Sequence, residues 1–281
     1  MTSVACSCVD LVCKGKKSCL VRQGGKLVFM TTKSLISMAA LTVMIFDCCQ
    51  QSLSAGSPLG PVDSSTRTAT LTGIVRFEGQ IPKPKTINMA ADPKCAKLHP
   101  TAVSGQDVLT DAQGGLKDAV VFVADGLSDT AMQPPTQPVV IEQKGCMYDP
   151  HIVAMQANQR LEIMNNDPTL HNIHPTPANN REWNKSQPPG SKTEETFSRE
   201  EIAIPVKCNI HPWMKGYVAV FKHPYFAVTA EDGSFDLRNL PPGTYTIKVW
   251  HQRLGTSTQK VTVAANERTA IKFVFKAQPT L

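Results

Sequence analysis

The stretch VKCNIHPWMKGYVAV, residues 206–220, places a cysteine, a histidine and a methionine three residues apart between two apolar runs. Taken singly, Cys208 beside a strand is typical of a small buried side chain, and Met214 near a turn is typical of a core. With His211 they form a set that also suits copper. Thiolate and thioether ligands are soft and stabilise Cu(I), whereas imidazole suits both oxidation states.

A copper site used for electron transfer requires a second imidazole from elsewhere in the chain. His171 can supply it, because it lies in NNDPTLHNIHP, residues 165–175, just after the predicted strand RLEIMNN. We expect His174 to face away from His171. The three histidines at positions 151, 223 and 251 have no role that the sequence assigns. The joint pattern therefore favours a metal site over an accidental cluster.

Two segments resemble the plastocyanin-like cupredoxins. CNIHPWMKGYVAV, 208–220, resembles the short ligand loop of the amicyanin branch, and YDPHIVAMQANQRLEIMNNDPTLHNIHP, 148–175, resembles the upstream strands. The resemblance covers residues 138–222 and implies a Greek-key β-sandwich, which we place at 137–224. It further implies that one copper ion is bound by four residues: His171, Cys208, His211 and Met214.

The same resemblance implies roles for the residues around the ligands. Asn172 is expected to hydrogen-bond to the cysteine loop and hold it in place. The edge of His211 is expected to reach the surface beside Pro212 and Trp213, where a redox partner protein would dock through a small apolar contact. One departure from the family is the long polar stretch 178–195, which we expect to form a surface lobe.

Short alternating segments on both sides of this region predict further strands. LTGIVRFEG (71–79), LKDAVVFVAD (116–125) and TAEDGSFDLRNLPPGTYTIKVW (229–250) resemble the carboxypeptidase regulatory-like, or transthyretin-like, β-sandwich. No segment has a long helical period, so the fold class is all-β. The simplest arrangement splits this second sandwich into 69–136 and 225–276, with the cupredoxin inserted between them. The alternative is a row of separate adjoining domains.

The N-terminal region has the features of an export signal. Lys33 precedes the apolar run 34–46, and small residues follow at 52–57. We therefore predict a signal peptide at 30–56, a Pro/Ser/Thr-rich linker at 57–68, and a periplasmic or extracellular mature protein without a transmembrane span.

Two alternatives stay open in this region, one for the start of the chain and one for the processing of the signal peptide. Segment 1–29 is either an over-extended reading frame, with the true start at Met30, or a disordered leader. A lipid anchor at Cys48 or Cys49 is the alternative to simple cleavage.

Charge gives no support for nucleic-acid binding. Residues 1–56 hold six Lys/Arg and two Asp/Glu. Residues 57–281 therefore hold 23 basic and 21 acidic residues, a net charge of only +2. No basic stripe accompanies this small excess.

Three cysteines remain after the predicted signal. Because exported proteins form disulfides, we expect Cys95 to pair with Cys146, which leaves Cys208 for the metal. A second metal site that combines Cys95 and Cys146 with His99 and His151 is the alternative.

These observations favour a one-electron carrier that is not an enzyme. A multicopper oxidase or a nitrite reductase needs histidines beside the cysteine, whereas Lys207 and Asn209 flank Cys208. Copper delivery and a surface binding module with a structural copper site remain alternatives. The sequence names neither the redox partner nor the oligomeric state.

Overall fold

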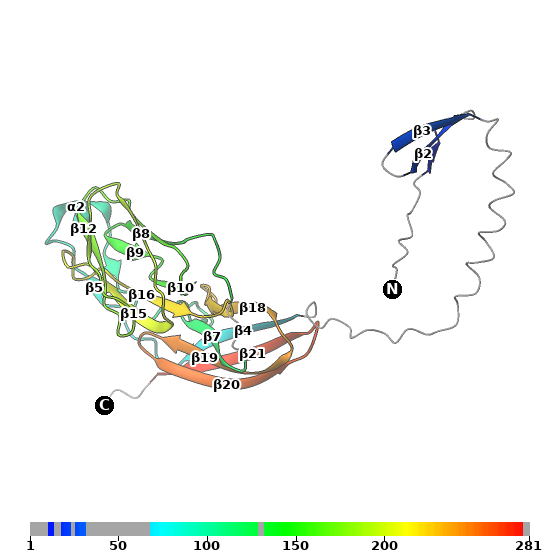
Figure 1. The fold of residues 1–281 in the computed structure, drawn as a ribbon. Helices are drawn as coiled ribbons and strands as arrows, with labels where there is room; N and C mark the ends of the chain where they lie inside the picture. The colour runs from blue at the N-terminus through cyan, green and yellow to red at the C-terminus, as the bar shows by residue number, and fades with distance from the viewer. Residues whose placement is uncertain (1–10, 14–17, 24–25, 32–67, 129–131, 278–281) are drawn as a thin grey trace. The chain divides into compact units, whose positions relative to one another are not determined.

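The computed structural model (Figure 1) describes residues 11–13, 18–23, 26–31, 68–128 and 132–277. The chain divides into two compact units, 1–63 and 64–281. The first contains an antiparallel sheet of three strands: β1 (Leu11–Cys13), β2 (Ser18–Gln23) and β3 (Lys26–Thr31). Apart from residues 30, 31 and 68, the predicted signal peptide and linker lie outside the described residues. Within the described ranges, no helix is long and apolar enough to cross a bilayer.

Strands build nearly all of the second unit, which confirms the predicted all-β fold class. In the described part of the chain the one helix is α2 (Pro93–Leu98). Asp92 caps its N-terminus by accepting hydrogen bonds from the backbone amides of Lys94 and Cys95, and Pro93 follows directly. An aspartate before a proline is a strong start signal for a helix, even for one of six residues.

The central part of the chain forms a two-sheet sandwich. Its strands are β8 (Val139–Lys144), β9 (Met147–Asp149), β10 (Ile152–Gln156), β11 (Leu161–Asn165), β12 (His171–Pro175), β13 (Lys185–Gln187), β14 (Lys192–Glu195), β15 (Glu201–Lys207) and β16 (Lys215–Phe221). One sheet has the order β10-β16-β15-β12-β13 and the other β14-β11-β8-β9. The parallel pairs β10/β16 and β8/β11 join strands that do not follow one another in the sequence, so the chain crosses between the two sheets.

The polar stretch 178–195 does not form the expected surface lobe. Its β13 pairs with β12 in one sheet, and its β14 pairs with β11 in the other. Gln187 explains part of this, because its buried side chain donates to the carbonyl of Ile163 and accepts from Gln143. A polar side chain therefore ties this stretch to the core, and hydropathy alone could not reveal that.

A second sandwich combines strands from both sides of the central region. These strands are β4 (Ala69–Glu78), β7 (Val120–Asp125), β17 (Phe226–Val228), β18 (Ser234–Leu240), β19 (Gly243–His251), β20 (Gly255–Val263) and β21 (Arg268–Lys276). The sheet orders are β18-β4-β21 and β17-β7-β19-β20. Strands β4 and β7 thus lie between strands that follow the central region, with Val75 opposite Phe273 and Val121 opposite Val249. The structure does not have the alternative row of separate domains.

Between β4 and β7 the chain leaves the second sandwich. Residues 80–104 include β5 (Thr86–Ile87), α2 and β6 (Val103–Ser104), and Figure 1 places α2 beside β12 at the end of the central sandwich. Met89 and Cys95 are buried in the same apolar cluster as the central strands. A separate cluster joins β7 to β10 and β16 through Phe122, Ile152 and Phe221. The two sandwiches are therefore packed against each other.

Candidate metal centre

Strand register brings the predicted ligands to one end of the central sandwich. Strands β15 and β16 form a hairpin with Lys207 opposite Lys215, so the loop 208–214 closes that hairpin. On the neighbouring strand β12, His174 lies opposite Lys207. His171, three residues earlier on that antiparallel strand, therefore extends past the end of β15 and alongside the loop.

The loop is tightly turned by its own backbone. The amide of Met214 donates to the carbonyl of His211 at 2.9 Å, and the amide of Cys208 donates to the carbonyl of Met214 at 3.2 Å. This folding brings the two ends of the loop together. The side chains of Cys208 and Met214 enter the same apolar cluster, and both are buried.

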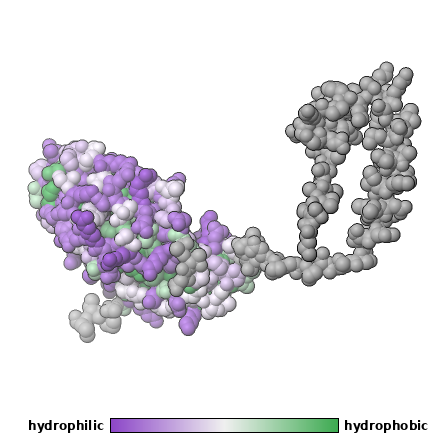
Figure 2. Space-filling view, viewed as in Figure 1, coloured by the Kyte–Doolittle hydropathy of each residue, from purple (hydrophilic) through white to green (hydrophobic). Residues whose placement is uncertain are grey.

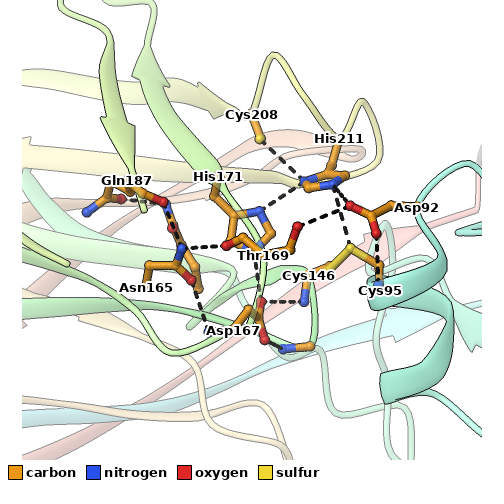
Figure 3. Close-up of polar contacts among 12 residues, drawn as sticks. Asp92, Cys95, Cys146, Asn165, Asp167, Thr169, His171, Gln187, Cys208 and His211 are labelled. Atoms are coloured by element: carbon orange, nitrogen blue, oxygen red, sulfur yellow. Dashed lines mark hydrogen bonds and ion pairs between the residues drawn. A yellow bond between two sulfur atoms is a disulfide. The ribbon is translucent and has the colours of Figure 1, made fainter. Parts of the chain in front are cut away.

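Three ligand atoms converge at this point (Figure 3). The Nδ1 atoms of His171 and His211 are 2.9 Å apart, and Cys208 Sγ is 3.8 Å from His211 Nδ1. All three atoms lie within 4.8 Å of one another. The three side chains are at most 3% exposed. The structure therefore brings these three predicted ligands together, with the buried Met214 in the same core.

Asn172 connects the histidine strand to the cysteine loop. Its Oδ1 accepts a hydrogen bond from the amide of Asn209 at 2.7 Å and another from Cys208 Sγ at 3.3 Å. Its Nδ2 donates to Asn184 Oδ1, and its carbonyl accepts from the buried Tyr148 hydroxyl at 2.7 Å. The two contacts of Oδ1 join Asn172 to the cysteine loop, as the family resemblance implied; the contacts with Asn184 and Tyr148 were not part of that expectation.

Two carboxylates that sequence reasoning did not assign complete the site. His171 Nε2 lies 2.9 Å from Asp167 Oδ2, and His211 Nε2 lies 3.0 Å from Asp92 Oδ2. Asp167 occurs in the Asn-x-Asp pattern before the ligand His171, which was a usable signal. No sequence signal marked Asp92, because its proximity to His211 depends on how the segment 80–104 packs against the central sandwich.

Hydrogen bonding outweighs burial in setting the pKa values of the site. Burial alone would lower the pKa of His171, but its hydrogen bonds with Asp167 and Cys208 raise it above the usual value. Burial alone would raise the pKa of Cys208, but the hydrogen bond with His171 and others from the loop backbone hold it at about 7. The pKa of Asp92 is lowered to about 2, chiefly by its hydrogen bond with His211.

A disulfide lies on the far side of His211. Cys95 and Cys146 are joined with an S–S distance of 2.04 Å, and Cys95 Sγ is 3.6 Å from His211 Nε2. The alternative second metal site is not assembled, because both thiols are in this bond. His99 instead bonds to the carbonyl of Gly145, and His151 bonds to Gln252.

The expected exposed edge of His211 is absent, and this expectation was wrong. The His211 side chain is 2% exposed, because Asp92 and the disulfide cover its Nε2. Pro212 is exposed, but Trp213 is half-buried and donates from Nε1 to the carbonyl of Cys146 at 3.1 Å. The ring of Trp213 lies 5.0 Å from that of His211, centroid to centroid.

The remaining histidines lie apart from the centre. His174 bonds to Asn209 and Glu182, which agrees with the expectation that it faces away from His171. His223 bonds to the carbonyl of Val123, and His251 accepts from the amide of Arg253.

The hydrogen-bond pattern fits a bound cation. A neutral imidazole carries one N–H, and a carboxylate accepts but does not donate. If His171 and His211 each use that N–H on a carboxylate, two bare Nδ1 lone pairs face each other at 2.9 Å. Such a pair requires a proton or a metal ion between the rings. Two imidazole nitrogens, a thiol and a nearby buried methionine form the donor set that suits copper.

Comparison with known proteins gives similarities for both sandwiches. Residues 217–276 match the carboxypeptidase regulatory-like domain family. No curated protein sequence matches the chain.

Solved structures similar to this chain include three copper proteins or cupredoxins. A purple cupredoxin from Nitrosopumilus maritimus is 22% identical, with a TM-score of 0.26, and the match covers 29% of this chain and 98% of that one. Amicyanin from Paracoccus versutus is 18% identical, with a TM-score of 0.28 and coverages of 36% and 96%. A Cu-containing nitrite reductase from Thermus scotoductus SA-01 is 19% identical, with a TM-score of 0.29 and 35% of this chain covered. The last match spans only 25% of the nitrite reductase chain. These three matches cover between 29% and 36% of this chain.

Proposed function

We propose that this protein is an exported mononuclear type 1 copper protein that carries one electron at a time. The observation that carries the proposal is the convergence of His171 Nδ1, His211 Nδ1 and Cys208 Sγ in a buried cluster. Copper bound there would supply the one-electron couple between Cu(I) and Cu(II).

The role of the protein in this proposal is to hold the ligands still. Asn172 holds the cysteine loop, Asp167 orients His171, and Asp92 orients His211. Ligands fixed by other groups move little when an electron arrives or leaves, which keeps the barrier to transfer low. Burial also keeps bulk water from the thiolate.

A redox partner protein would dock on the apolar surface at this end of the molecule. Three of the four exposed large hydrophobic residues on the described surface adjoin site elements: Leu98 ends α2, Leu170 precedes His171, and Ile210 precedes His211. Figure 2 shows apolar surface at the end where Figure 1 places α2. With Pro212 and Trp213, these residues suit a small, transient contact. Because His211 is covered, the electron would pass through Trp213 or the Asp92 segment instead of an open imidazole edge.

Export to the periplasm or the cell surface accompanies the proposal. The disulfide between Cys95 and Cys146 belongs in an oxidising compartment. The apolar run 34–46 with its preceding lysine supports a cleaved signal peptide.

Copper delivery is the second candidate, and the burial of the site counts against it. Delivery needs ligands that a recipient can reach, whereas His171, Cys208 and His211 are all nearly inaccessible. An enzymatic role has no support in the residues beside Cys208. A binding module with a structural copper site would use the same ligands without a redox cycle.

Adding Cu(II) to the purified mature protein tests the proposal. We expect an intense thiolate-to-copper band in the visible spectrum, its reversible loss on reduction, and its absence in Cys208→Ser. A protein that stays colourless with Cu(II) but binds Cu(I) would support delivery. A band that no reductant bleaches would indicate a structural ion.

A further inference from the structure

Each ligand histidine has a carboxylate on its outer nitrogen. Asp167 and His171 are both at least 96% buried, and their atoms are 2.9 Å apart. Asp92 is 22% exposed, and its Oδ2 lies 3.0 Å from Nε2 of the buried His211. Because a carboxylate only accepts, both contacts place the imidazole proton on Nε2 and leave Nδ1 free to face Cys208.

Both carboxylates are themselves held in position. Asp167 accepts the amides of Gly145 and Cys146, each at 2.7 Å. Asp92 caps α2 and accepts the Thr169 hydroxyl at 3.2 Å. Neither side chain can rotate away from its histidine without breaking these bonds. The orientation of both imidazoles is thus fixed before any metal arrives.

The two aspartates come from different parts of the fold. Asp167 lies between β11 and β12, within the central sandwich. Asp92 lies in the segment 80–104, which leaves the second sandwich after β4 and returns to it at β7. The central sandwich therefore does not contain its complete metal centre. The surrounding domain supplies the group that faces His211.

We infer that Asp92 and Asp167 are positioning residues that set the histidine tautomers and bias the centre toward Cu(II). This inference rests on the proposed copper function. A negative charge close to the ligands stabilises the ion of higher charge more strongly, and burial strengthens that effect. A hydrogen bond from Nε2–H to a carboxylate also makes the other ring nitrogen, Nδ1, a more basic metal ligand. The second sandwich thereby adjusts the redox preference of the first.

Asp92→Asn provides the test, because asparagine removes the charge. Its single accepting oxygen can face the Nε2–H of His211, and the amides of Lys94 and Cys95 then lose their side-chain acceptor. We expect the ratio of Cu(I) to Cu(II) affinity to increase about tenfold, which is about 59 mV in midpoint potential. The thiolate-to-copper band should remain. Asp118→Asn is the control, since Asp118 is a buried aspartate whose amide donates to the carbonyl of Thr229, beside β17 of the second sandwich, and we expect no change in potential there. An unchanged potential in Asp92→Asn would overturn the inference.

The apoprotein gives a readout that needs neither copper nor a variant. Long-range ¹H–¹⁵N correlation spectra of the wild-type protein distinguish the two tautomers of each histidine. We expect an Nε2–H signal for both His171 and His211. At least one of the two Nδ1 atoms should be unprotonated, because only one proton can lie between them. Nδ1–H tautomers with bare Nε2 atoms would refute the positioning role. A wild-type protein without a blue band would refute the proposed function alone.

Discussion

Asp92 and His211 are 119 positions apart in the chain, yet Asp92 Oδ2 lies 3.0 Å from His211 Nε2. Between them the chain completes most of the central sandwich. Two groups support this contact. The disulfide between Cys95 and Cys146 ties the helix that follows Asp92 to the central sandwich, and the Thr169 hydroxyl donates to Asp92 Oδ2. A segment of one sandwich thus covers the end of the other that holds the candidate metal centre, so the stability of the two sandwiches is linked at this contact.

Removing the disulfide should therefore cost stability and loosen this cover. Cys95 and Cys146 are 51 residues apart. A crosslink across a loop of this length contributes about 4 kcal/mol through the entropy of the unfolded chain. We expect the double variant Cys95→Ala/Cys146→Ala to lose about that much free energy of unfolding in urea. Reducing the wild-type protein should give the same loss, and a difference below about 1 kcal/mol would contradict this prediction.

The loop of Cys208 should depend on Asn172. In Asn172→Ala the partly buried amide of Asn209 and the buried thiol of Cys208 lose their acceptor. We expect a loss of about 2 kcal/mol in the free energy of unfolding. Asn184→Ala is the control, because it removes only the exposed partner of Asn172 and should cost less than about 0.5 kcal/mol. Equal losses in the two variants would show that Asn172 does not hold the loop.

Local sequence pattern predicted which side chains cluster at the candidate metal centre, but not their surroundings. Cys208, His211 and Met214 share one loop, so their proximity follows from spacing alone, and His171 follows from the strand that precedes it. Alternation of apolar residues likewise predicted most strands. These features depend on neighbours in the chain, which a sequence displays directly.

Contacts between distant segments set the rest. The burial of His211 depends on Asp92, and the residues around either side chain do not predict the contact between them. The polar stretch 178–195 was misjudged for a similar reason, since Gln187 is buried through partners on other strands. Buried polar groups appear hydrophilic in a sequence whatever their partners are, so such contacts become visible only in the folded structure.

Met214 should influence the reduction potential if it provides the thioether ligand. In Met214→Leu an apolar group replaces the sulfur, and we expect the midpoint potential to rise while the blue band persists. Met155→Leu is a matched control, since Met155 is also fully buried in the same apolar cluster. Protein-film voltammetry on both variants makes the comparison. A shift of the same size in Met155→Leu would mean that core packing, not ligation, sets the potential.

Stability should fall with acidification because of His251, which is remote from the metal centre. Burial lowers the pKa of His251 to about 4, and the nearby charges of His151 and Arg253 act in the same direction while Asp107 opposes them. In the unfolded chain the pKa of this imidazole is 6.5. Above pH 6.5 both states hold a neutral ring and the contribution is complete. Between pH 6.5 and about 4 the unfolded chain binds a proton that the folded protein does not, so stability is lost as pH falls.

The loss attributable to His251 should reach about 3 kcal/mol across that interval, at about 1.4 kcal/mol per pH unit. His251→Gln removes the titration but keeps a polar side chain that can accept from the amide of Arg253. Urea unfolding of the apoprotein at a series of pH values gives the comparison. The stability difference between wild type and variant should be largest near neutral pH and should shrink as pH falls, whereas the contributions of other groups cancel in that difference. Parallel curves for the two proteins would show that His251 does not control this pH dependence.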